Sequence, residues 1–354
     1  MEKSKKVLNY IFIEGLSGMA LGLFATLIIG TIIKQIGSYV PGVIGTYLVV
    51  IGKVASSVTG AGIGCGVAYK FKESPLVTFS AAVCGMMGAF ASNIIAGKVL
   101  VDGVIQYSGP GEPLGAYIAA ITGITVGRLV AGKTKMDILV TPLVTVSTGS
   151  ILGLLFGPPI SGFMTWLGEI VNWSTERQPF LMGVLVSVIM GMILTLPISS
   201  AALGLILNLS GIAAGAATVG CCANMIGFAV ASFRENGWGG FFAQGVGTSM
   251  LQIPNIMKKP VIWLPAIISS AILGPIATLV FHMENNATGS GMGTSGLVGQ
   301  LMTYEVMAAS EAPGLVIVKI LLLHVILPGA IALGVSELMR KKGLIKTGDM
   351  KLDL

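Results

Sequence analysis

The sequence predicts an all-α polytopic membrane protein with about nine transmembrane helices and two or three broken or re-entrant segments. Three observations carry this prediction. The 354-residue chain is 54% hydrophobic and 10% charged, whereas soluble domains carry about 25% charged residues. Apolar runs of roughly 20 residues recur, which is the length that crosses ~30 Å of hydrocarbon. Lysine and arginine cluster between these runs, as the positive-inside rule requires of cytoplasmic loops.

The expected crossings follow one another along the chain. The apolar runs are 7–33, 41–69, 75–97, 113–130, 136–156, 178–207, 210–232, 260–282 and 313–335. The first run is followed by Lys34 rather than by a small-residue cleavage site, so we expect a retained span and not a signal peptide. The basic clusters place both termini in the cytoplasm. Residues 341–354 are expected to form a cytoplasmic basic tail.

Three segments do not fit a simple crossing. Pro158 and Pro159 are expected to break the chain before 160–173, an amphipathic stretch that lies at the interface or re-enters. The stretch 238–255 lies between basic residues that share one side of the membrane, so it is expected to dip in and return. The stretch 283–311 is too polar for a full crossing and is also expected to insert partially.

Both of the last two stretches contain the same phrase, G-x-G-T-S-x-L. The copies are Gly245–Leu251 and Gly291–Leu297. Glycine permits breaks in a helix, and irregular backbone inside a membrane must find hydrogen-bond partners in protein or in a bound solute. The repeat therefore predicts a solute site between two re-entrant segments, with backbone N–H groups as donors.

Polar side chains in and near the two phrases are the first candidates for binding the solute. They are Thr248, Ser249, Asn255, Thr294, Ser295, Gln300 and Glu284. Hydroxyls, amides and carboxylates exchange hydrogen bonds with polar solutes, whose transfer out of water is otherwise costly. For Thr and Ser the alternative is capping of two short helices. For Glu284 the alternative is an exposed charge in an outer loop, and Glu305 is a second candidate carboxylate.

Four further candidates lie in other apolar runs. Ser199 and Ser200 follow Pro197, where the bend frees backbone groups that hydroxyls satisfy unless they face a solute. Asn224 lies in mid-span and either bonds another helix or contacts the solute. Lys53 is the one basic residue deep in an apolar run, where charge is usually functional, although a long side chain can also reach the interface.

The sequence shows no enzyme site. It contains no phosphate-binding Walker motif, no paired-histidine metal motif and no nucleophile elbow. We therefore expect no catalytic residues, no cofactor and no bound metal. The net charge of +6 is spread over loop clusters, so it predicts contact with the lipid bilayer and not with nucleic acid.

The residues carry a resemblance to a known family. Leu196–Ala202, Gly220–Gly227, Gly247–Met250 and Gly291–Gln300 together resemble the compact enzyme-IIC-like transporters of the phosphotransferase system, a group that includes perfringolysin-regulator-like membrane proteins. The resemblance covers roughly 10–340. It implies a bacterial inner-membrane transporter, a homodimer and an elevator-type movement, with a scaffold-like part over 1–156 and a hairpin-bearing transport part over 157–340.

The chain differs from a complete phosphotransferase transporter because it has no IIA-like or IIB-like domain. Phosphoryl transfer would therefore need separate IIA/IIB-like cytoplasmic proteins as partners. The first hypothesis is a permease that moves a small polar solute, a sugar or a sugar-like molecule. The alternatives are a phosphorylation-independent secondary carrier of a small metabolite or anion, a solute-sensing membrane regulator, and a channel.

Overall fold

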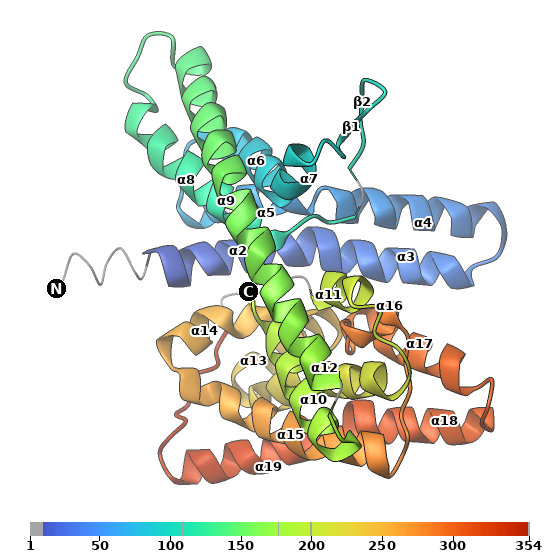
Figure 1. The fold of residues 1–354 in the computed structure, drawn as a ribbon. Coiled ribbons are helices and arrows are strands. Elements are labelled where there is room, and N and C mark those ends of the chain that lie inside the picture. The colour runs from blue at the N-terminus through green and yellow to red at the C-terminus, as the bar shows by residue number, and fades with distance from the viewer. Residues whose placement is uncertain (1–9, 108, 176, 199, 353–354) are drawn as a thin grey trace. The chain divides into compact units, whose positions relative to one another are not determined.

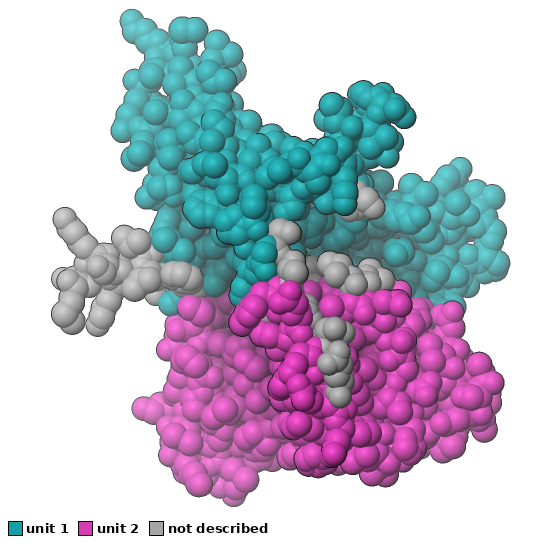
Figure 2. Space-filling view, in the orientation of Figure 1, with its two compact units in different colours: residues 1–163 teal, residues 164–354 magenta. Residues whose placement is uncertain are grey.

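The computed structural model describes residues 10–107, 109–175, 177–198 and 200–352. The side chains at positions 12, 161, 164, 165, 167, 168, 172, 202, 205 and 206 lie outside this description. The chain divides into two compact units, residues 1–163 and residues 164–354 (Figure 2). Each unit is a bundle of helices with its own apolar interior (Figure 1).

Unit 1 consists of helices joined by short turns. Its elements are η1 (Tyr10–Gly15), α2 (Leu16–Leu23), η2 (Phe24–Ile28), α3 (Ile29–Tyr39), α4 (Gly42–Ser57), α5 (Thr59–Lys70), α6 (Pro75–Ala89), α7 (Ala91–Ile95), β1 (Leu100–Val101), β2 (Val104–Ile105) and α8 (Pro113–Val130). The two short strands form an antiparallel hairpin, pairing Leu100 with Ile105. This hairpin was not predicted, because two residues in each strand are too few for a periodic pattern.

Glycine lets the helices of unit 1 approach one another closely. In α5, Gly64 faces the backbone of Ala81 in α6, and a Cβ atom at this position would overlap the Ala81 carbonyl. The glycines of α2 and α5 face each other in the same way. Small residues at such contacts are how membrane helices gain van der Waals packing without a hydrophobic driving force between them. The glycine-rich composition therefore fixes the helix crossings of this unit.

Several helices of the structure are candidates for membrane spans. Within the described residues, six helices are long and apolar enough to cross a membrane. The α4–α5 pair is bent by 53° and makes a seventh candidate if it is counted as one span. Two further apolar helices, Pro75–Ala89 and Pro179–Thr195, are shorter than the 18 residues of a candidate span, so the described residues hold six or seven candidates where the sequence predicted about nine crossings. The expected all-α polytopic architecture is confirmed.

Helix α9 (Asp137–Thr175) corrects one expectation. Pro158 and Pro159 do not end the helix, which continues for 39 residues from unit 1 into unit 2. A proline removes one backbone hydrogen bond, but in a membrane helix the freed carbonyl can be satisfied by local adjustment, so the helix can continue past a proline. The expected break at this position is therefore wrong.

Unit 2 contains both repeated phrases and is more fragmented. Its elements after α9 are α10 (Pro179–Thr195), α11 (Ser200–Ile206), α12 (Gly211–Ala231), α13 (Phe233–Phe242), η3 (Ala243–Gly247), η4 (Ser249–Gln252), α14 (Ile253–Lys258), η5 (Pro260–Trp263), α15 (Leu264–Leu279), α16 (Ala287–Ser290), η6 (Ser295–Leu297), α17 (Val298–Met307), α18 (Pro313–Ile320), η7 (Leu321–Ile326) and α19 (Leu327–Lys341). The break after α10 falls at Leu196–Pro197, as the sequence predicts.

Helix α12 is the centre of unit 2. It packs against α10, α15 and α19, and almost all of its side chains are buried. Its sequence is dominated by alanine, glycine and cysteine, so neighbours approach it from every side. One apolar cluster joins α10, α11 and α12, and a second joins α12 to α15, α17 and α18. Both phrases are built around this helix.

Candidate functional site

The first phrase lies in a stretch where three kinds of helix succeed one another. Helix α13 is interrupted at Gly237, whose φ of 57° is readily adopted only by glycine. A π-helical segment, η3, then ends at Thr248, which is extended, with φ −161° and ψ 140°. The Thr248 hydroxyl accepts a hydrogen bond from the amide of Met250 at 3.1 Å and so caps the 3₁₀ turn η4.

The two ends of this first stretch return to the same place. Glu235, near its start, accepts hydrogen bonds from Arg340 at 3.2 Å and from the amide of Gly348 at 3.0 Å. Lys259, at its end, forms an ion pair of 2.6 Å with Asp349. Gly348 and Asp349 are consecutive, so residues 236–258 leave this end of unit 2 and come back to it.

The two ends of the second stretch also lie together, and a single lysine, Lys319, bonds both of them. We call such a junction of the two ends a closure. The ammonium group of Lys319 donates to the carbonyl of Phe281 at 2.9 Å and to the carboxylate of Glu311 at 2.7 Å. Residues 282–310, which contain the second phrase, therefore also begin and end at one place. Within the stretch lie α16, η6 and α17.

The two closures lie at opposite ends of one helix. Elements α18, η7 and α19 form a continuous span over Pro313–Lys341. Lys319 is near its start and Arg340 is near its end. At 1.5 Å per residue the two positions are about 30 Å apart, which is close to the thickness of the hydrocarbon layer. The two stretches thus enter the interior of unit 2 from opposite ends.

Between these ends the two phrases meet. Element η3, from the first stretch, lies against η6, from the second, and both η3 and η4 lie against α12. Gly293 shows how close the second phrase comes to this helix. It has a φ of 52°, and a Cβ atom there would be 2.8 Å from the carbonyl carbon and Cβ of Cys221. Only glycine combines this backbone conformation with this contact.

A hydrogen-bond network on α12 holds the first phrase. The Asn224 side chain is fully buried and donates to the carbonyl of Gly220 and the hydroxyl of Ser270, both at 3.2 Å. Its oxygen accepts from Trp263 Nε1 at 2.9 Å and from the Thr195 hydroxyl at 3.2 Å. Thr195 is in turn 2.8 Å from the Ser249 hydroxyl. All bonding positions of the Asn224 amide are occupied, so Asn224 positions Ser249.

The start of the second phrase is held by contacts of its own. The Asn285 side chain lies within hydrogen-bond distance of the Thr218 hydroxyl at 2.7 Å, the Thr303 hydroxyl at 2.9 Å and the Gly299 carbonyl at 3.1 Å. The Ser200 hydroxyl donates to the carbonyl of Gly291 at 2.7 Å. These bonds satisfy a broken backbone in an apolar interior.

Three buried polar atoms at and beyond the second phrase have no hydrogen-bond partner among the described residues: Ser295 Oγ, Gln300 Oε1 and His324 Nε2. Gln300 Nε2 lies 3.2 Å from His324 Nδ1 and 3.3 Å from Cys222 Sγ, so it joins η7 to α12. Residue His324 lies in the π-helical segment η7, and such segments occur frequently at functional sites. Unpartnered polar groups in an apolar interior are costly unless a further molecule satisfies them.

Most of the predicted site residues are gathered in unit 2, but they divide into two kinds. Thr248, Ser249, Asn224 and Ser200 already have protein partners, whereas Ser295 has none among the described residues. The Thr294 hydroxyl has only a weak contact with Met225 Sδ at 3.4 Å. All of these residues are buried.

The other predicted residues lie elsewhere. Glu284 is half-buried outside the phrases and Glu305 is exposed, while Asn255 contacts the C-terminal tail. Lys53 belongs to unit 1 and is exposed there, and Ser199 lies outside the described residues. The sequence reasoning missed Thr195, Trp263 and His324. His324 lies in the middle of its apolar run, whereas His282 is the last residue of its own, and this difference could have identified His324.

We predict that the Asn224 network is essential for folding. Asn224→Leu leaves the buried indole N–H of Trp263 without its partner and removes one hydrogen bond each from Thr195 and Ser270, so it should lower the free energy of unfolding by roughly 2–4 kcal/mol. Thermal unfolding in detergent measures this, with the exposed Asn93→Leu as control. Equal melting temperatures for the two variants would show that the network is dispensable.

We predict a similar cost at the contact of the second phrase with α12. Gly293→Ala combines a strained φ with an overlap at Cys221 and should lower the free energy of unfolding by about 1–3 kcal/mol. Gly314→Ala is the matched control, because a Cβ atom there meets nothing within 4 Å. An unaltered melting temperature in Gly293→Ala would contradict the close contact.

A comparison with known protein families identifies the family of the chain. The family model described as "Phosphotransferase system, EIIC" matches residues 13–352. No curated protein matches the chain. The narrower similarity to perfringolysin-regulator-like proteins stays a prediction. Since the family match covers nearly the whole chain, and the structure provides the expected apolar helices, the chain is a polytopic membrane protein that belongs to the EIIC family of the phosphotransferase system.

Proposed function

We propose that this permease-type transporter moves a small, neutral, polar solute, a sugar or a sugar-like molecule, across the bacterial cytoplasmic membrane. In this proposal the two phrase-bearing stretches re-enter the membrane from opposite faces. The solute binds where they meet, in contact with Ser295, Gln300 and His324. Unit 2 is then the transport part and unit 1 the scaffold part, each working within an elevator-type cycle.

The observation that carries the proposal is the pairing of two closures with one meeting point. The first stretch begins and ends beside Arg340 and Asp349, and the second begins and ends beside Lys319. A segment that crossed the membrane once would have its two ends on opposite faces. Two segments that enter from opposite faces and meet in the middle form a site that each face can reach in turn, which is the arrangement that alternating access needs.

The unpartnered atoms are of the kinds that a hydroxylated solute satisfies. If the Gln300 amide donates to His324 Nδ1, the proton of the imidazole is on Nε2, which becomes a free donor. Gln300 Oε1 is then a free acceptor, and the Ser295 hydroxyl acts in both ways. A solute hydroxyl donates one hydrogen bond and accepts others, so it matches this mixed set.

The absence of formal charge around the phrases favours a neutral solute. The polar side chains around them, among the described residues, end in hydroxyl, amide, thiol, thioether or imidazole groups. The ion pairs found among the described residues of unit 2 lie at its ends, at Lys319–Glu311, Lys259–Asp349, Arg340–Glu235 and Arg234–Glu337. A buried anion would need a paired cation, so the ionic solute of a secondary carrier is less well suited to these residues.

The remaining parts of the proposal concern partners and orientation. In this proposal both termini lie in the cytoplasm, because basic residues precede the first apolar run and follow α19, in agreement with the positive-inside rule. The protein is a homodimer, and separate IIA/IIB-like proteins supply phosphoryl groups. The family implies a solute and leaves room for such partners.

We predict that Ser295→Ala weakens solute binding about three- to tenfold, the effect of one lost hydrogen bond, while leaving thermal stability unchanged because no protein bond is lost. Binding is measured by calorimetry against hexoses, pentoses, sugar alcohols and small organic acids. Thr248→Ala is the counterpart: it removes a cap and should lower stability by ~1 kcal/mol.

If Ser295→Ala binds the solute with wild-type affinity, the Ser295 hydroxyl does not contribute to the binding site. Tight binding of an organic acid, with no sugar or sugar alcohol bound, would instead support the phosphorylation-independent carrier.

A further inference from the structure

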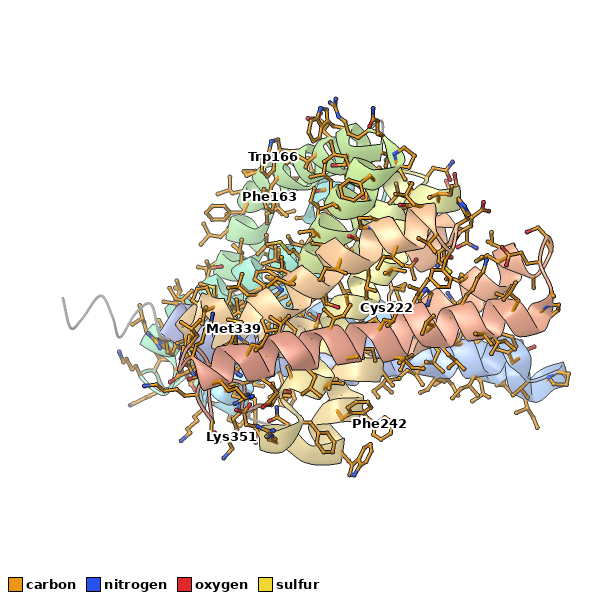
Figure 3. All side chains as sticks on the ribbon, turned by 90° about the horizontal axis from the view of Figure 1, so that it is seen from below. Phe163, Trp166, Cys222, Phe242, Met339 and Lys351 are labelled. Atoms are coloured by element: carbon orange, nitrogen blue, oxygen red, sulfur yellow. The ribbon has the colours of Figure 1, made fainter. Side chains whose placement is uncertain are left out.

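The C-terminal tail does not extend into solvent but docks onto unit 2. Ile345 and Met350 are almost completely buried, and Leu352 is buried as well. Figure 3 shows Lys351 and Met339 toward the same end of unit 2, whereas Cys222 lies nearer its middle. The tail therefore covers the end at which the first stretch is closed. A basic tail was expected from the sequence, but its buried apolar residues are what fix its position.

The side chain of Asn236 binds backbone groups of the tail. Its side-chain amide donates to the carbonyl of Met350 at 2.9 Å, and its side-chain oxygen accepts from the amide of Leu352 at 2.8 Å. One asparagine thus bonds both a carbonyl and an amide group of the tail backbone, two residues apart, as a neighbouring β-strand would. This form of recognition depends on the path of the tail and little on the identity of its side chains.

A ladder of amide side chains connects the tail to both sides of the first phrase. Gln252 donates to the Met350 carbonyl at 3.0 Å and to Gln244 Oε1 at 2.8 Å. Asn255 donates to the Lys351 carbonyl and to Gln252 Oε1, at 2.8 Å and 2.9 Å. Gln244 directly precedes the phrase and Gln252 directly follows it. The tail carbonyls are therefore linked to the two residues that flank the phrase.

The ion pair between Lys259 and Asp349 adds to the attachment of the tail to unit 2. Burial alone would raise the pKa of Asp349, but its hydrogen bonds from Lys259 and from the Lys346 amide, together with the charges of both lysines, lower it overall. The contribution of Asp349 to stability is thus present above its ordinary pKa and is lost as the pH falls through the lowered value. At neutral pH the carboxylate is charged and the ion pair is intact.

We propose that residues 343–352 are a latch that restrains the first-phrase loop, residues 243–258, through the amide ladder. When the tail is docked, the loop is held at both flanks. When the tail is released, Gln244, Gln252 and Asn255 lose the connection that fixes them, and the loop gains freedom to move. The regulation of transport by this latch rests on the proposed function, whereas the restraint of the loop does not.

Hydrogen exchange of the full-length protein in detergent, without added solute, tests the latch. Asn236→Asp retains the acceptor but loses the donor to Met350, and Asp349→Asn weakens the pair with Lys259. Each should make exchange in residues 243–258 at least about tenfold faster, together with exchange in the tail. Lys351→Ala is the matched control: its side chain is exposed, and only its backbone carbonyl is bound. It should exchange like the wild type.

Helix α12 must stay protected in each variant, which shows that unit 2 remains folded. If Asn236→Asp loses this protection, Asp349→Asn decides the outcome. Faster exchange in the tail alone, with residues 243–258 unchanged, would overturn the latch, as would unchanged exchange in both regions. Because the experiment contains no solute, its result tests the latch alone. The latch can be confirmed even if the proposed solute site is wrong.

Discussion

The need to satisfy polar groups inside an apolar interior governs the structure of unit 2. Two stretches of broken backbone enter this interior, and each unpaired N–H or C=O there costs free energy. Helix α12 provides several of the partners. Asn224 binds the elements around the first phrase, Thr218 binds Asn285 at the base of the second stretch, and the backbone at Cys221 receives Gly293. The helix can do this because its small side chains leave its own backbone within reach of its neighbours.

Much of the fold could be predicted from the sequence, because apolar length and basic loops are local signals. Helix α8 begins and ends at Pro113 and Val130, the residues that bound its apolar run. The repeated phrase was also a local signal, since two copies of a glycine-rich motif in short apolar stretches indicate two broken segments. The structure adds that η3 and η6 lie in contact. Which residues of each phrase have partners depends on distant elements and was not accessible from the pattern.

The features that escaped prediction are those in which residues far apart in the chain cooperate. Thr195 and Trp263 gain their role only because α10 and η5 bring them to Asn224. Lys319 closes the second stretch by bonding Phe281 and Glu311. The prolines of α9 were misjudged for a related reason, since the effect of a proline depends on what else satisfies the freed carbonyl. In the tail, Met350 is a single apolar residue in a polar segment, and the sequence pattern alone does not show that it is buried.

Labelling of single cysteines from each face of the membrane tests the central claim most directly. In a chain whose four native cysteines are replaced, the exposed positions Arg234, Lys258, His282 and Ser310 are changed to cysteine one at a time. We predict that the first two react from one face and the last two from the opposite face, because each stretch returns to the end from which it started. Reaction of 234 and 258, or of 282 and 310, from opposite faces would contradict the account.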